Sequence, residues 1–143
     1  MRYTTALLDG LASLLAEVGL AVYRPDAVYS ASEVGVLFSV LPDTPDGAIV
    51  LTAYSVEDTD LTDVVTGVQV RMRRGRDPRA VEDLADGVFD LLHNRRGLVL
   101  NGVHVALVWR QSQAPMGQDV HGRQEIAANY YFRATRPSPH LYE

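Results

Sequence analysis

The spacing of apolar residues along the chain predicts two amphipathic helices. Between Leu7 and Val18 apolar side chains recur every three or four positions, and Gly19 stands where a left-handed residue commonly ends a helix. The second pattern begins after Asp77, a favoured N-cap residue, with Pro78 at the first helical position. Each helix therefore has one apolar face that must be buried against another element.

Shorter apolar segments predict about five strands. Some are nearly continuous apolar runs, typical of strands covered on both faces, and the others alternate apolar and polar residues. The dipeptide Asn101-Gly102, which two-residue type I′ hairpin turns favour, interrupts one of these segments. The predicted strand segments are 35–42, 48–55, 64–74, 98–111 and 125–135.

The alternation also assigns side chains to the two faces of a strand. Arg71 and Arg73 fall together on the polar face of the segment 64–74. Tyr130 falls on the apolar face of the last strand, whereas Tyr131 lies on the other face. Because aromatic residues are enriched in protein interfaces, Tyr131 is a candidate subunit contact.

The order helix, strands, helix, strands predicts the α+β class. We expect a single domain over residues 1–143, with both helices packed on one face of a mostly antiparallel sheet of about five strands. Residues 136–143, with two prolines, form an extended C-terminal tail in this interpretation. The chain shows no internal repeat and no linker between domains.

Composition narrows the possible functions. The chain has 143 residues, a net charge of −5 and no cysteine, which excludes disulfides and thiolate chemistry and argues against a general nucleic-acid binder. It has neither an 18-residue apolar run nor the long apolar core of a signal peptide. We therefore expect no membrane association, and a protein that stays in the cytoplasm where it is made unless it is packed into a particle.

Charge is distributed unevenly along the sequence. The region from Pro25 to Val70 has no basic residue, and a cluster of arginines follows it directly. Such runs are commonly solvated faces, but two oppositely charged regions on one chain also suit head-to-tail assembly. The candidate contact residues are Arg71, Arg73, Arg74 and Arg76 on the basic side and Glu57, Asp58, Asp60 and Asp63 on the acidic side.

The segment 115–123, PMGQDVHGR, is the strongest candidate for a functional loop. Its Asp119 and His121, with Glu125 beyond them, match no established metal-ligand spacing, and its glycines lead into a strand instead of the helix that a phosphate loop requires. No serine has an obvious histidine partner. We therefore expect no catalytic, metal or cofactor-binding residues, and interpret the segment as a loop between strands that touches a partner. Its candidate contact residues are Pro115, Met116, Gly117, Gln118 and Asp119.

Several longer stretches resemble the tail terminator, or minor capsid, proteins of tailed bacteriophages, especially siphovirus-like phages of actinobacteria. The similar stretches cover most of residues 7–140 and read LLDGLASLLAEVGLAVYRP, LPDTPDGAIVLTAY, VTGVQVRMRRGRDPRAVEDLADGVFDLLH, QSQAPMGQDVHGRQEIAANYYF and RPSPH. The resemblance implies a virion protein without cofactor that forms a ring, typically hexameric, on the head-proximal end of the tail tube. Such a ring stops tube polymerisation and joins the tail to the head-side connector, and DNA passes through its pore without specific binding.

In such a ring each subunit meets the next through two different surfaces. The arginines and the acidic residues are candidates for those surfaces, but they are close in sequence and can also pair within one subunit. A third possibility is that the acidic residues line the pore and repel the phosphates of DNA. These uses remain open at the level of sequence.

Two alternative functions also remain. The chain can be another neck component, such as a head-closure or tail-completion protein. In the other alternative it is a small metal-dependent DNA-processing enzyme that uses Asp58, Asp60 or Asp119.

Overall fold

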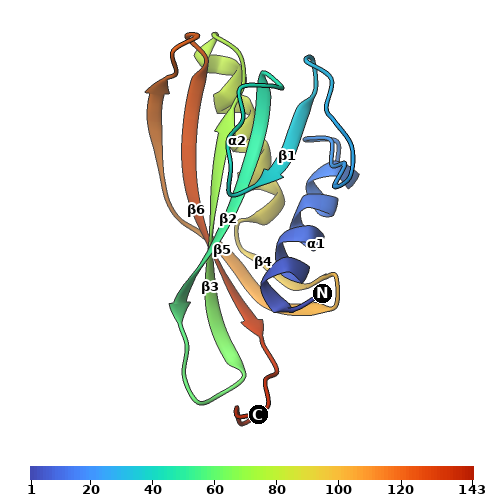
Figure 1. Ribbon diagram of the computed structural model, residues 1–143. Helices are drawn as coiled ribbons and strands as arrows, with labels where there is room; N and C mark the ends of the chain where they lie inside the picture. The colour runs from blue at the N-terminus through green and yellow to red at the C-terminus, as the bar shows by residue number, and fades with distance from the viewer.

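A computed structural model describes all 143 residues and contains two helices and six strands (Figure 1). Both predicted helices are confirmed. The segment around Asn101-Gly102 forms the predicted hairpin, and both turn residues have the positive φ values that a type I′ turn needs. The elements are α1 (Tyr3–Glu17), β1 (Val34–Phe38), β2 (Gly47–Glu57), β3 (Asp63–Arg73), α2 (Pro78–Leu92), β4 (Arg95–Leu100), β5 (Val103–Gln118) and β6 (Gln124–Thr135).

The strands form one curled sheet in the order β1-β2-β3-β6-β5-β4. The prediction of about five mostly antiparallel strands was therefore only partly right, since the sheet has six strands and is mixed. β1 pairs with β2 in parallel, from Val34 opposite Gly47 to Phe38 opposite Leu51, and every other pair is antiparallel. The apolar run in β1 specifies a buried strand but not its direction, which depends on the path of residues 39–46 back along the sheet.

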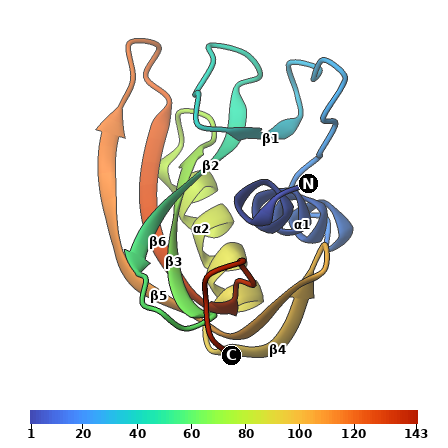
Figure 2. The same ribbon diagram turned by 60° about the horizontal axis from the view of Figure 1, so that its bottom comes forward.

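Both helices lie on the same side of the sheet, as the sequence predicted, and the sheet curls around them (Figure 2). Asp77 caps α2 by accepting a hydrogen bond from the amide of Arg79 at 3.0 Å. The apolar faces of the two helices and the inner face of the sheet form one core of 27 buried residues. No helix is long and apolar enough to span a membrane.

Tyr130 is fully buried in this core, and its hydroxyl has no hydrogen-bond partner. Burial raises the pKa of Tyr130 to about 12 against the opposing effect of the nearby Arg110 guanidinium, which makes no hydrogen bond of good geometry to the hydroxyl. Because a buried hydroxyl without a partner costs free energy, we expect Tyr130→Phe to raise the free energy of unfolding by about 1 kcal/mol. Urea denaturation measures this change, and a loss of stability would show that the hydroxyl is satisfied in solution.

Candidate subunit interfaces

The acidic residues and the arginines lie at opposite ends of the sheet. The turn between β2 and β3 (58–62) forms one end, which we call the acidic end, and β3 finishes at the other end (Figure 1). The 11 residues of β3 separate the two groups by roughly 35 Å. This geometry excludes the possibility that the two groups neutralise each other within one subunit.

The side chain of Arg73 forms hydrogen bonds within the subunit. Alternation places it on the same face as Arg71, as predicted, but the side chain is only 2% exposed because the loop 41–47 folds over the end of β3. Its Nε donates to the carbonyl oxygen of Asp46 at 3.0 Å. Its Nη2 donates to the carbonyl oxygens of Pro42 and Pro45 at 2.7 Å and of Asp43 at 3.3 Å. Arg73 therefore holds this loop to the sheet and is not available to a partner.

The turn between β5 and β6 (119–123) is tied to the same loop. Asp119 accepts hydrogen bonds from the amides of His121 and Arg123, both at 2.9 Å, and from Nε of Arg123 at 2.8 Å. Arg123 in turn donates from Nη1 to the carbonyl oxygen of Asp43 at 2.6 Å and to the carboxylate of Asp46 at 3.1 Å. We call this region, the loop 41–47 with the turn 119–123 and the end of β3, the clamp end of the molecule.

The remaining acidic candidate in this region is also part of an ion pair. Glu125, at the start of β6, is buried and accepts two hydrogen bonds from Arg71, from Nε at 2.9 Å and from Nη2 at 2.6 Å. The two residues lie on the same outer face of neighbouring strands. Of the side chains that suggested a metal loop in the sequence, Asp119 and Glu125 therefore each have an arginine as partner, and Nε2 of His121 lies 3.5 Å from the carboxylate of Asp43.

The clamp end should be sensitive to acid through Asp119. Burial alone raises the pKa of Asp119, but the hydrogen bonds from the amide and guanidinium of Arg123 and the amide of His121 outweigh it and lower the pKa to about 2. This pKa lies below the value of about 3.9 for Asp in an unfolded chain, so the carboxylate stabilises the fold above about pH 4. The contribution is lost as the pH falls through the folded pKa.

We expect Asp119→Asn to lower the free energy of unfolding at neutral pH, and this difference to narrow as the pH falls from about 4 to about 2. Urea denaturation over a pH series measures it. The control is Asp60→Asn, an exposed acidic residue that forms no ion pair. If the difference in free energy of unfolding between Asp119→Asn and the wild type stays constant down to the lowest pH, the hydrogen bonds from Arg123 and His121 to Asp119 are contradicted.

Pro115 to Gln118 belong to a strand and not to a loop, which corrects the interpretation from the sequence. Pro115 lies opposite Ile126 and Gly117 opposite Glu125, with a register shift between them. This shift accommodates Pro115, which has no N–H to donate to a ladder. Only residues 119–123 form the turn.

The other candidate residues remain exposed. Arg74 forms no ion pair, and Nε of Arg76 donates only to the carbonyl oxygen of His121 at 3.0 Å. At the acidic end Glu57, Asp58 and Asp60 form no ion pair. Asp63 lies 3.7 Å from Arg133. The C-terminal tail covers part of this end, because the amide of Tyr142 donates to the carbonyl oxygen of Asp60 at 2.8 Å.

The carboxylates required by a metal-dependent enzyme do not come together. Asp58 and Asp60 lie at the acidic end, and Asp119 lies at the clamp end, a strand length away. No group of three or more His, Asp or Glu side chains in the structure is arranged to hold a metal ion.

Tyr131 lies on the outer face of the sheet within a row of aromatic residues. Tyr54, Gly67, Tyr131 and Trp109 are opposite one another on four neighbouring strands. The rings of Trp109 and Tyr131 make an edge contact at 5.7 Å. The hydroxyl of Tyr54 donates across Gly67 to Asn129 at 2.9 Å. The sequence indicated Tyr131 alone, since which residues lie opposite it depends on the pairing of strands far apart in sequence.

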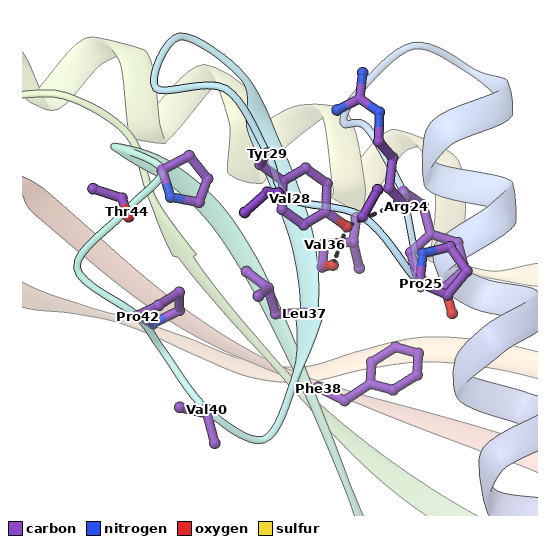
Figure 3. A pocket seen from close by; sticks show the side chains of 13 residues that line it. Arg24, Pro25, Val28, Tyr29, Val36, Leu37, Phe38, Val40, Pro42 and Thr44 are labelled. Atoms are coloured by element: carbon purple, nitrogen blue, oxygen red, sulfur yellow. Dashed lines mark hydrogen bonds between the residues drawn. The ribbon is translucent and has the colours of Figure 1, made fainter.

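A groove beside β1 was not predicted from the sequence. It has a volume of about 390 Å³ and lies between the segment 23–29, β1 and the loop 40–45 (Figure 3). The hydroxyl of Tyr29 donates to the carbonyl oxygen of Val36 at 2.7 Å and holds the wall of the groove (Figure 3). Val28 and Val40 at its rim are 93% and 68% exposed. The sequence contains one indication of this groove, the apolar residues Val28 and Val40, which stand in a region otherwise typical of turns.

Comparison with known proteins identifies the family. A family model described as bacteriophage tail terminator protein matches residues 14–136. A chain from the virion of a native gene transfer agent particle superposes with a TM-score of 0.59 at 19% identity, covering 94% of this chain and 95% of that chain. A second solved chain of equal identity and coverage has a TM-score of only 0.47, and no curated protein matches. The solved structures show the fold alone, whereas the family model covers most of the sequence. The chain therefore belongs to the bacteriophage tail terminator family, a family of structural virion proteins.

Proposed function

We propose that this chain forms a closed hexameric ring on the head-proximal end of the tail tube. There it stops polymerisation of the major tail tube protein and joins the tail to the head-side connector. The observation that carries this proposal is the match to the tail terminator family over residues 14–136. The likeness of the fold to a chain of a virion particle supports a place within an assembled particle.

The two ends of the subunit suit two different neighbours. The acidic end presents Glu57, Asp58 and Asp60, all exposed and free of ion pairs, whereas the clamp end presents Arg74 and Arg76. A ring with its strands running along the tail axis has all acidic ends on one rim and all clamp ends on the other. One rim then meets the tail tube and the other meets the connector, while DNA passes through the pore.

The function is tested by polymerising the major tail tube protein in the presence of this chain. We expect tubes that stop growing, each with one added layer at a single end visible by electron microscopy. Tubes that grow unchanged, without a bound layer, would contradict a terminator. A labelled protein found on the head side of the connector in virions would instead assign another neck component.

The role of the acidic rim is tested separately with Asp58→Asn/Asp60→Asn. We expect this variant to form rings but to bind its tube or connector neighbour at least tenfold more weakly at low salt, with the difference shrinking as salt screens the charges. Asp83→Asn, which removes an exposed carboxylate of α2, away from the acidic end, is the control. Unchanged binding to both neighbours would remove the acidic rim from the interface.

A further inference from the structure

One flank of the clamp end is an open sheet edge with unusual composition. β4 pairs only with residues 103–108 of β5, so the outer edge of β5 from Trp109 to Gln118 has no neighbouring strand. The eight residues 111–118, QSQAPMGQ, contain no charge, and Met116 is 56% exposed. Proteins commonly protect such edges with charged side chains, and residues 111–118 of this edge have none.

This edge is better suited to contacts through side chains than to continuation of the sheet. Pro115 has no N–H to donate, and the register shifts between Arg110 and Ser112 and again between Pro115 and Gly117. Both features interrupt the regular row of backbone donors and acceptors that a further strand needs. The edge therefore presents an extended, uncharged segment centred on Pro115 and Met116.

The β1 groove lies on the opposite flank of the same end. β1 and β5 are on opposite sides of β2, β3 and β6 in the sheet, and both figures show the β5–β6 hairpin and β1 on opposite sides of the molecule (Figures 1 and 2). Aromatic rings and prolines line the groove, among them Tyr29, Phe38 and Pro42. Arg24, the only charged residue that lines the groove, is paired with Glu33 at 2.5 Å.

The uncharged edge segment and the apolar groove are chemically complementary. Proline-rich segments in the polyproline II conformation bind grooves lined by aromatic side chains, because little conformational freedom is lost on binding. The edge segment, with its single proline, is likewise already held extended by its pairing with β6. The centres of protein interfaces are depleted of charge, as both of these surfaces are. A ring built from identical subunits uses each of two different surfaces once per subunit, and it closes when they lie on opposite flanks at a suitable angle.

We propose that the edge segment Gln113–Met116 of one copy docks in the β1 groove of the next copy. This inference rests on the proposed ring and names its subunit contact. Pro115 and Met116 enter the groove, Val28 and Val40 at the rim become buried, and the turn 119–123 comes to lie beside the neighbouring copy.

The absence of cysteine in the chain allows a direct test by cross-linking. Val40→Cys/Met116→Cys places one thiol at the groove and one on the edge segment, and a short bismaleimide joins thiols that lie close together. We expect a ladder of covalent oligomers that ends at the ring size, and a single linked dimer when the two single variants are mixed. The control, Leu61→Cys/Met116→Cys, moves the first thiol to the acidic end and should yield no ladder.

A second variant tests the same contact without cross-linking. Met116→Asp places a charge in the docked segment and should weaken assembly at least tenfold, whereas Val99→Asp, at an exposed position of β4, should leave it unchanged. Rings that form in the wild type but give no Val40–Met116 cross-link and tolerate Met116→Asp would overturn this contact and leave the proposed function intact. A protein that never forms a ring, on its own or on tail tubes, would overturn the proposed function itself.

Discussion

Replacing Arg73 by alanine is expected to lower the free energy of unfolding by about 3 kcal/mol, since a buried carbonyl left without a donor costs roughly 1–3 kcal/mol and the Pro45 carbonyl is buried, while the carbonyls of Pro42 and Asp46 are partly buried. The guanidinium donates to four carbonyl oxygens of the loop 41–47 and is almost completely buried. Burial, followed by repulsion from Arg123, lowers the pKa of Arg73. Urea denaturation of the purified variant measures the loss.

The adjacent arginine provides the matched control. Arg74→Ala removes an exposed side chain without an ion pair and should change stability by less than about 0.5 kcal/mol. Arg73→Lys keeps the charge but offers a compact ammonium in place of a planar fork, so it should recover less than half of the loss. Equal effects of Arg73→Ala and Arg74→Ala would show that the loop 41–47 does not depend on this clamp.

The second large effect is expected at Gly10, in the middle of α1. A Cβ atom there would lie 2.7 Å from the carbonyl carbon of Leu100 and 2.9 Å from the amide nitrogen of Asn101. Alanine favours a helix over glycine by roughly 0.5–1 kcal/mol, but forcing an extra methyl group into a packed site costs typically 1–3 kcal/mol. Because the obstructing atoms belong to the backbone, we expect Gly10→Ala to destabilise the protein by about 1–2 kcal/mol in thermal or urea denaturation.

Gly87 in α2 is the matched control, because its helical position is similar and its obstruction is different. A Cβ atom at Gly87 would meet only the Cδ2 atom of Leu20 closely, at 2.6 Å, and that side chain can rotate away. Gly87→Ala should therefore be neutral or slightly stabilising. A stabilising effect of Gly10→Ala would contradict the close packing of α1 against the β4–β5 turn.

Local patterns in the sequence were sufficient to predict both helices, most of the strands and the faces of several side chains. The cap at Asp77, the turn at Asn101-Gly102 and the burial of Tyr130 follow from residue type and spacing within a few positions. The shared face of Arg71 and Arg73 follows from alternation alone. Each of these features depends on interactions that are local in the chain.

The features that were missed depend on contacts between distant segments. Arg73 looks like a surface residue in its own strand, and only the loop 41–47, which begins 32 positions earlier in the sequence, buries it. The direction of β1 and the groove beside it depend on how residues 39–46 return to the sheet. No local pattern contains this information. The sequence could therefore indicate candidate interface residues by their type, but it could not show which of them are buried and which are exposed.

The mass of the assembled protein in solution provides the most direct test of this interpretation, and light scattering coupled to size-exclusion chromatography measures it. We expect one discrete species whose mass is six times that of the subunit. A single subunit mass at every concentration, with or without tail tubes present, would contradict a protein that works by locking identical copies into a ring.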